Sequence, residues 1–157
     1  MSFPEKVFTG KELKVAKALV DSGHKHNLTV EGESEFTKKV NEALGFIKDA
    51  KYYEYLRTYI RSIKEIDGMT QLRQAEVAIW ANKFAVDNPI DAASLFIQKA
   101  YSMQEYLEGK LYYGGEAERR SIAKRLEFLE NLKEKSPDSK VKAECERLLE
   151  LWRDNTH

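Results

Sequence analysis

The chain has 157 residues, and its 26 basic and 26 acidic side chains cancel to a net charge of zero. This length suits a single domain over residues 1–157 that buries a core of its own, so no disulfide or metal is needed merely to fold it. Charge balance excludes a general nucleic-acid binder, which needs surplus Lys and Arg to displace counterions. No apolar run approaches the roughly 20 residues of a membrane-spanning helix. The sequence therefore predicts no nucleic-acid partner and no membrane partner.

Cysteine usage and the first residues bear on the cellular compartment. Cys145 is the only cysteine, so no internal disulfide can form, which fits a reducing cytosol. The opening Met1–Lys6 lacks the basic and then apolar regions of a secretory signal. We therefore expect a cytoplasmic protein, with Cys145 as a small buried side chain on a helix.

Hydrophobic periodicity, caps and turn residues predict the elements in chain order. Gly23 suits a helix end because glycine tolerates positive φ. Asn88 and Pro89 suit a helix start, because Asn caps the first turn and Pro fits it. The expected elements are a helix from Thr9 or Gly10 to Ser22, a strand at Leu28–Glu31, a helix from Ser34 through Ile47, a helix at Tyr52–Tyr59, strands at Ile60–Ile66 and Glu76–Ala81, and helices from Pro89 to near Gly109, from Gly115 through Leu132 and from Ser139 through Trp152. The predicted fold class is α+β, mostly helical, with about six helices and a small sheet.

The common short motifs of catalysis are absent from this sequence. It has no phosphate-binding glycine loop, CxxC pair, GxSxG elbow or intact HExxH. His24 and His26 would face the same side of an extended segment as a metal pair, or lie in a turn as solvated histidines. Two ligands are too few for a structural zinc, which requires four. A cluster of tyrosines either packs at the core and its rim or stacks bases or sugars: Tyr52, Tyr53, Tyr55 and Tyr59.

A resemblance to a known family emerges in the second half of the chain. Ala92–Ser102, with the sequence AASLFIQKAYS, resembles the active-site helix of small zincin-type metallopeptidases, in which an apolar start leads into HEAxH. Tyr106–Lys110 is similar to the Gly-Lys turn of that family, and Gly115–Glu118 is similar to its acidic EAE helix. Upstream, Val40–Leu44 and Ile79–Asn82 are similar to its opening helix and edge strand. The resemblance extends from Leu28 to Leu132 and implies a zincin-like fold.

The same resemblance implies that the catalytic machinery is lost. The two zinc-binding histidines of HExxH correspond to Gln98 and Ser102, and the glutamate that activates water corresponds to Lys99. Only the acidic ligand downstream survives, as Glu116 or Glu118. A catalytic zinc needs about three good protein ligands. The resemblance therefore implies degenerate active-site positions with no catalytic residue, no metal and no cofactor.

Lys99 suggests what replaces the metal if the fold is kept. Its ammonium would lie near the vacated metal position, so a Lys99–Glu116 ion pair could link the two helices in place of zinc. In the alternative, Lys99 is an ordinary exposed lysine, and Glu116 is an acid at a helix N-terminus favoured by the helix dipole.

The expected function is that of a catalytically inactive metallopeptidase-like protein, a pseudoenzyme that serves as a binding or regulatory module. A peptide or protein partner would add to the edge of the strand that carries Val77, Ile79 and Trp80, as substrates do in zincins. The alternative is a small helical structural or interaction protein, unrelated to peptidases, whose helices pack with one another or with a partner chain. A third possibility is an enzyme that uses Glu116, Glu118 and a tyrosine.

Overall fold

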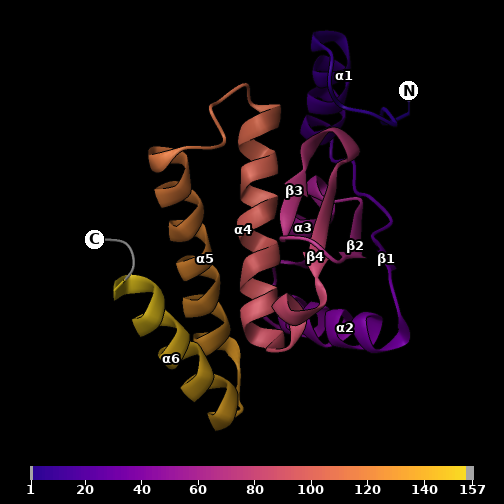
Figure 1. Cartoon of the computed structure of the whole chain (residues 1–157). Helices are drawn as coiled ribbons and strands as arrows, with labels where there is room; N and C mark the ends of the chain where they lie inside the picture. Colours follow the sequence, from indigo (N-terminus) through magenta and orange to yellow (C-terminus); the bar gives the residue numbers. More distant parts are fainter. Residues whose placement is uncertain (1, 155–157) are drawn as a thin grey trace.

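The computed structural model describes residues 2–154, and these form six α-helices and a four-stranded sheet (Figure 1). The helices are α1 (Gly10–Asp21), α2 (Ser34–Asp49), α3 (Tyr53–Tyr59), α4 (Pro89–Leu107), α5 (Gly115–Lys135) and α6 (Ser139–Asp154). The strands are β1 (Thr29–Glu31), β2 (Ser62–Ile66), β3 (Gln71–Arg73) and β4 (Ala78–Asn82), with short 3₁₀ turns η1 (Gln74–Glu76) and η2 (Lys83–Val86) on either side of β4. The α+β, mostly helical fold class is confirmed. No helix among these residues is long and apolar enough to cross a membrane.

The residues predicted to start and stop helices do so. Thr9 accepts a hydrogen bond from the backbone N–H of Glu12, whose carboxylate in turn accepts from the backbone N–H of Thr9. This reciprocal capping box fixes the start of α1. Gly23 follows the end of α1 at a φ of +94°. At α4, the Asn88 side chain accepts from the N–H groups of the first turn, and Pro89 takes the first helical position.

The sheet has the strand order β1-β2-β4-β3, with β3 antiparallel and the other strands parallel. The interior place of β4 corrects the prediction of a peptide-binding edge at Val77, Ile79 and Trp80. Ile79 and Trp80 have β2 on one side and β3 on the other. Val77 precedes the strand at a φ of +58°, and its C=O accepts from the backbone N–H of Arg61. This left-handed residue also explains why β4 begins at Ala78 and not at Glu76.

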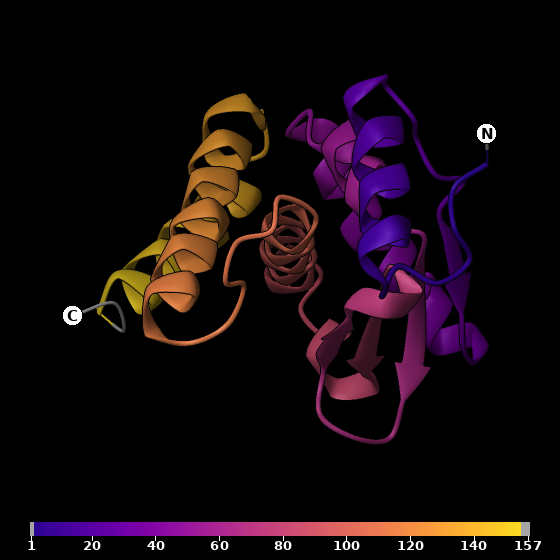
Figure 2. The same ribbon diagram turned by 90° about the horizontal axis from the view of Figure 1, so that it is seen from above.

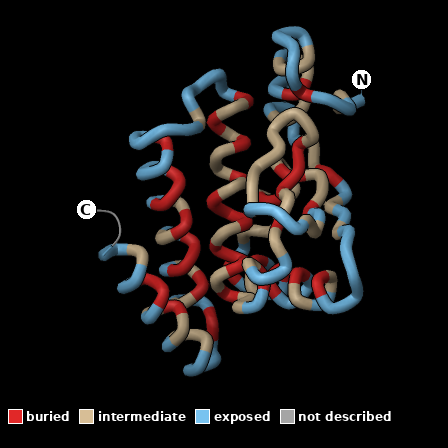
Figure 3. Tube along the Cα trace, viewed as in Figure 1, coloured by how far each residue is buried: buried red, intermediate tan, exposed pale blue. Residues whose placement is uncertain are grey.

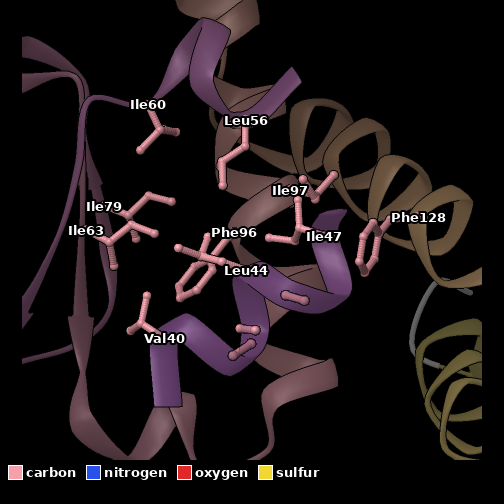
Figure 4. Close-up of a cluster of buried hydrophobic side chains, with 14 of the residues drawn as sticks. Val40, Leu44, Ile47, Leu56, Ile60, Ile63, Ile79, Phe96, Ile97 and Phe128 are labelled. Atoms are coloured by element: carbon pink, nitrogen blue, oxygen red, sulfur yellow. The ribbon is translucent and has the colours of Figure 1, made fainter. Parts of the chain in front are cut away.

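The hydrophobic core lies between one face of the sheet and helices α2, α3 and α4, and it continues between α4, α5 and α6 (Figures 3 and 4). Phe96 of α4 is fully buried, and around it lie Ile63 and Ile79 from the sheet with Leu44 of α2 and Leu56 of α3 (Figure 4). Seen from above, α4 lies in the middle, between the α5–α6 pair and the rest of the chain (Figure 2). The two flanks of α4 are therefore the places where its polar side chains meet other elements.

Candidate functional site between α4, α5 and the edge of the sheet

A buried polar network joins α4 to α5 around the guanidinium of Arg125, which is 3% exposed. Asp91, Ser94 and Gln98 lie on one side of α4, because positions i, i+3 and i+7 share a helix face. Arg125 donates to Gln98 Oε1 at 2.7 Å and to Ser94 Oγ at 2.9 Å. It also forms an ion pair with Asp91 Oδ1 at 2.8 Å. Burial lowers the pKa of Arg125, and the Asp91 carboxylate opposes that shift.

Gln98 has no free hydrogen-bonding atom in this network. Its carbonyl oxygen accepts from Arg125, and its amide nitrogen donates to Ser121 Oγ at 3.1 Å. The hydroxyl of Ser121 donates in turn to the backbone C=O of Glu118. The ring of Trp152 in α6 covers Arg125, with the guanidinium carbon 4.1 Å from the ring centroid. Gln98 is only 6% exposed, so the interface at this point is closed.

The predicted Lys99–Glu116 ion pair is wrong. Glu116 is 76% exposed and pairs with Arg119 one turn further along α5. The physical reason is the rotation of α5, which turns Ala117 and Ser121 inward and leaves Glu116 facing solvent. Glu118 is also exposed. In the described part of the chain, neither acid lies within ion-pair distance of Lys99.

Lys99 is half-buried and makes no hydrogen bond or ion pair with any residue that the structure describes. Burial lowers its pKa, Glu118 opposes the shift, and the nearby charge of Arg125 adds to it. Lys99, Ser102 and Tyr106 share one side of α4. The hydroxyl of Tyr106 donates to the backbone C=O of Val7, whose N–H donates to Ala75 just after β3. The side of α4 that carries Lys99 therefore borders the edge of the sheet.

These residues do not fit the zinc that the resemblance implies for an active zincin. Gln98 uses its amide oxygen on Arg125, Lys99 offers an ammonium, and the Ser102 hydroxyl is directed at the backbone C=O of Gln98 at 3.4 Å. Glu116 is bound to Arg119. Within residues 2–154, no group of three or more His, Cys, Asp or Glu side chains is placed to hold a metal ion.

β3 is a free edge of the sheet, and it packs beside α4 (Figure 1). The backbone N–H of Asn82 points toward the β3 side, where it donates to Thr70 Oγ1. Because backbone groups alternate along a strand, the N–H and C=O of Trp80 also point toward β3, where they bond to the backbone of its partner Gln71. The N–H and C=O of Leu72 then point away from β4, toward the open edge. A hollow of about 220 Å³ runs along this edge, lined by residues 71–76.

The two histidines near the N-terminus are neither solvated nor a complete metal site. The rings of His24 and His26 pack on each other and on Phe3, with centroids 4.5–5.1 Å apart. His26 is only 5% exposed, and burial, followed by the charges of His24, Arg61 and Arg57, lowers its pKa to about 4. His157 lies outside the described residues. The pair therefore belongs to the packing of the N-terminal segment.

The tyrosine cluster packs and forms hydrogen bonds, as one of the two sequence alternatives proposed. The hydroxyl of Tyr52 donates to Glu127, and its ring lies edge-on to Phe128. Tyr55 donates to Gln104 of α4. The ammonium of Lys124 lies over both tyrosine rings. Cys145 is buried in α6, as expected.

Sequence reasoning missed Arg125 and Ser121, although a signal was present. The apolar stripe of α5 includes Ala117, Ile122 and Leu129, and its helical spacing makes the intervening positions 121 and 125 inward-facing as well. A charged residue at an inward position predicts a buried partner.

No protein-family model, curated protein or solved structure matches the chain.

Proposed function

We propose that this protein is a non-catalytic binding module, a zincin-like pseudoenzyme that binds an extended peptide. The observation that carries the proposal is Gln98. At the position where the resemblance puts the first zinc ligand, both polar atoms of its amide are engaged, by Arg125 and Ser121. In this proposal, the hydrogen bonds around Arg125 connect α4 and α5, as a metal ion would in an active zincin. We propose a cytoplasmic location as well, because the single cysteine allows no internal disulfide.

The peptide would pair with β3 and not with β4. Leu72 directs its backbone donor and acceptor outward, and main-chain bonds of this kind supply affinity when a peptide extends a sheet. β3 has only three residues, so this pairing alone would be weak and would rely on side chains nearby.

Panning a phage-displayed library of random nonapeptides against the purified protein tests peptide binding. Leu72→Pro removes the outward N–H without touching a bond to β4, because proline is tolerated on an edge strand at a position that does not pair inward. Leu72→Val is the matched control, since it keeps the N–H. Enriched peptides that bind the parent and Leu72→Val but not a folded Leu72→Pro protein support the proposal. A library that yields no binder, or binders indifferent to Leu72→Pro, overturns it.

The non-catalytic character is tested by elemental analysis of the purified protein. We expect well under one zinc per chain, because the donors that would bind it are occupied. Stoichiometric zinc, removed by a chelator and restored on dialysis, would overturn the pseudoenzyme proposal.

The helical interaction alternative has less support. The exposed large hydrophobic side chains of the described residues are scattered over separate segments, and among α5 and α6 only Leu151 is one of them. Isolated exposed hydrophobic residues are normal on protein surfaces. An enzyme based on Glu116 and Glu118 has no support either, because both carboxylates lie in solvent and Glu116 is paired with Arg119.

A further inference from the structure

The outer face of the sheet carries cations beside β3. Arg73 lies over the Trp80 ring, with its guanidinium carbon 4.2 Å from the centroid, and Lys64 of β2 lies 5.6 Å from the same centroid. Arg73 and Lys6 share one carboxylate, that of Glu76, at 3.6 and 2.8 Å. Lys64 lies two strands away from β3, with Glu31 of β1 opposite it in the sheet. Beside β3, two cations therefore share a single carboxylate.

The inner side of the same edge faces α4, where Lys99 lies. This ammonium is half-buried, and no carboxylate within the described residues pairs with it. Burial and the charge of Arg125 lower its pKa, and the charge of Glu118 raises it. A partly buried cation without a partner is costly, and an incoming carboxylate would offset that cost.

We infer that the ligand of the β3 edge is an acidic extended peptide, whose carboxylates bind Lys99 on the inner face and Arg73 on the outer face. The inference rests on the proposed function. Side chains of a strand alternate between faces, so a peptide paired with Leu72 presents one set of side chains to α4 and the other set to the Trp80 face. Complementary charge on both faces then sets the specificity that backbone pairing lacks.

The probes are three soluble nonapeptides of identical length. The first carries four glutamates spread over both strand faces, the second has glutamine at those positions, and the third has lysine there. Binding is followed by the amide shifts of Gln71–Arg73 in ¹⁵N spectra at two salt concentrations. We expect the acidic peptide to bind about tenfold more tightly than the glutamine peptide, to lose affinity as salt is added, and the lysine peptide not to bind.

Lys99→Met keeps the length of the side chain and removes its charge. We expect it to weaken binding of the acidic peptide about tenfold and to leave the glutamine peptide unaffected. Lys99→Arg should restore most of the affinity. Lys140→Met, at an exposed lysine in the first turn of α6, is the control and should change nothing.

The outcomes separate this inference from the proposed function. If the glutamine or lysine peptide shifts Gln71–Arg73 as strongly as the acidic one, or if Lys99→Met has no effect, the acidic specificity is wrong while peptide binding at β3 stands. If Leu72→Pro fails to reduce binding of any peptide, the β3 site itself is wrong.

Discussion

At the scale of single residues, the role of Gln98 differs most from the role that the sequence suggested. The resemblance identifies it as a metal ligand that has been lost, but the structure shows an amide with both polar atoms bonded across α4 and α5. A buried charge such as Arg125 is tolerated only when its donors are satisfied, and Asp91, Ser94 and Gln98 supply the acceptors. The stability of the helix pair should therefore depend on these acceptors as a unit.

Gln98→Leu should destabilise the protein by about 1–3 kcal/mol, because it leaves one donor of Arg125 buried without an acceptor. Adding Arg125→Met to this variant should cost less than the sum of the two single changes, since the stranded donor is then removed as well. Urea unfolding of the parent, both single variants and the double variant measures this cycle. Strictly additive effects would show that the two side chains do not act together.

His26 should make stability fall as the pH is lowered below neutrality. Burial lowers the pKa of His26 to about 4 in the folded chain, whereas an unfolded histidine titrates near 6.5. Between these values the unfolded chain binds the extra proton, so folding is opposed progressively from about pH 6.5 down to pH 4 and unaffected above that window. The loss between pH 7 and pH 5 should reach at most about 2 kcal/mol, because each pH unit between the two pKa values is worth about 1.4 kcal/mol.

His26→Leu is the variant that tests this dependence. Its free energy of unfolding should change less than that of the parent between pH 7 and pH 5, measured in urea at each pH. Parallel pH profiles for the two proteins would contradict the assignment.

At the scale of elements, helices were predictable and the sheet was predictable only in part. A helix can be recognised from apolar residues that repeat with a period of 3.6 and from cap residues at its ends, as in α1 and α4. β3 was missed because Gln71–Arg73 has only three residues, two of them polar, and its pairing with β4 is a contact made in three dimensions. The same pairing turned β4 from an expected edge into an interior strand.

The junction of β1 and α2 leaves no room for a side chain at Gly32. A Cβ there would lie 2.6 Å from Phe36 Cδ1 and 2.9 Å from Glu65 Cβ. Gly32→Ala should therefore destabilise the protein by about 1–3 kcal/mol, as overpacking does. Gly45→Ala is the matched control, since Gly45 lies inside α2 with nothing within 4 Å of a new Cβ. It should stabilise by about 0.5–1 kcal/mol, because alanine favours helix.

Thermal unfolding of the parent and both glycine variants checks this pair. A Gly32→Ala protein as stable as Gly45→Ala would mean that Phe36 and Glu65 can move aside.

At the scale of the whole molecule, α4 is shared by two neighbours. Its sheet-facing side completes the core with Phe96, and its opposite side closes on α5 and α6 through Arg125 and Trp152. The side of α4 that carries Lys99 lies between the sheet and α5, next to β3. The proposed peptide site thus lies where the open edge of β3 meets the side of α4 that carries Lys99, so no single element defines it.

Restoring the motif should not be enough to restore zinc binding. In the triple variant Gln98→His, Lys99→Glu and Ser102→His, the Arg125 cation stays buried beside the site and repels a metal ion. Adding Arg125→Leu should tighten zinc binding at least about tenfold relative to the triple variant, as measured by calorimetric titration. Equal affinity in the two variants would show that Arg125 is not what closes the site.

The sequence by itself determined the helices, their caps, the mostly helical α+β class and the absence of a histidine-based metal motif, because these depend on local periodicity and residue type. The tertiary structure alone decided that Gln98 bonds to Arg125, that Glu116 faces solvent and that β3 and not β4 is the free edge. The physical reason is that helix rotation and strand order are set by packing between distant segments. Small angular differences there decide whether a charged side chain meets a partner or water.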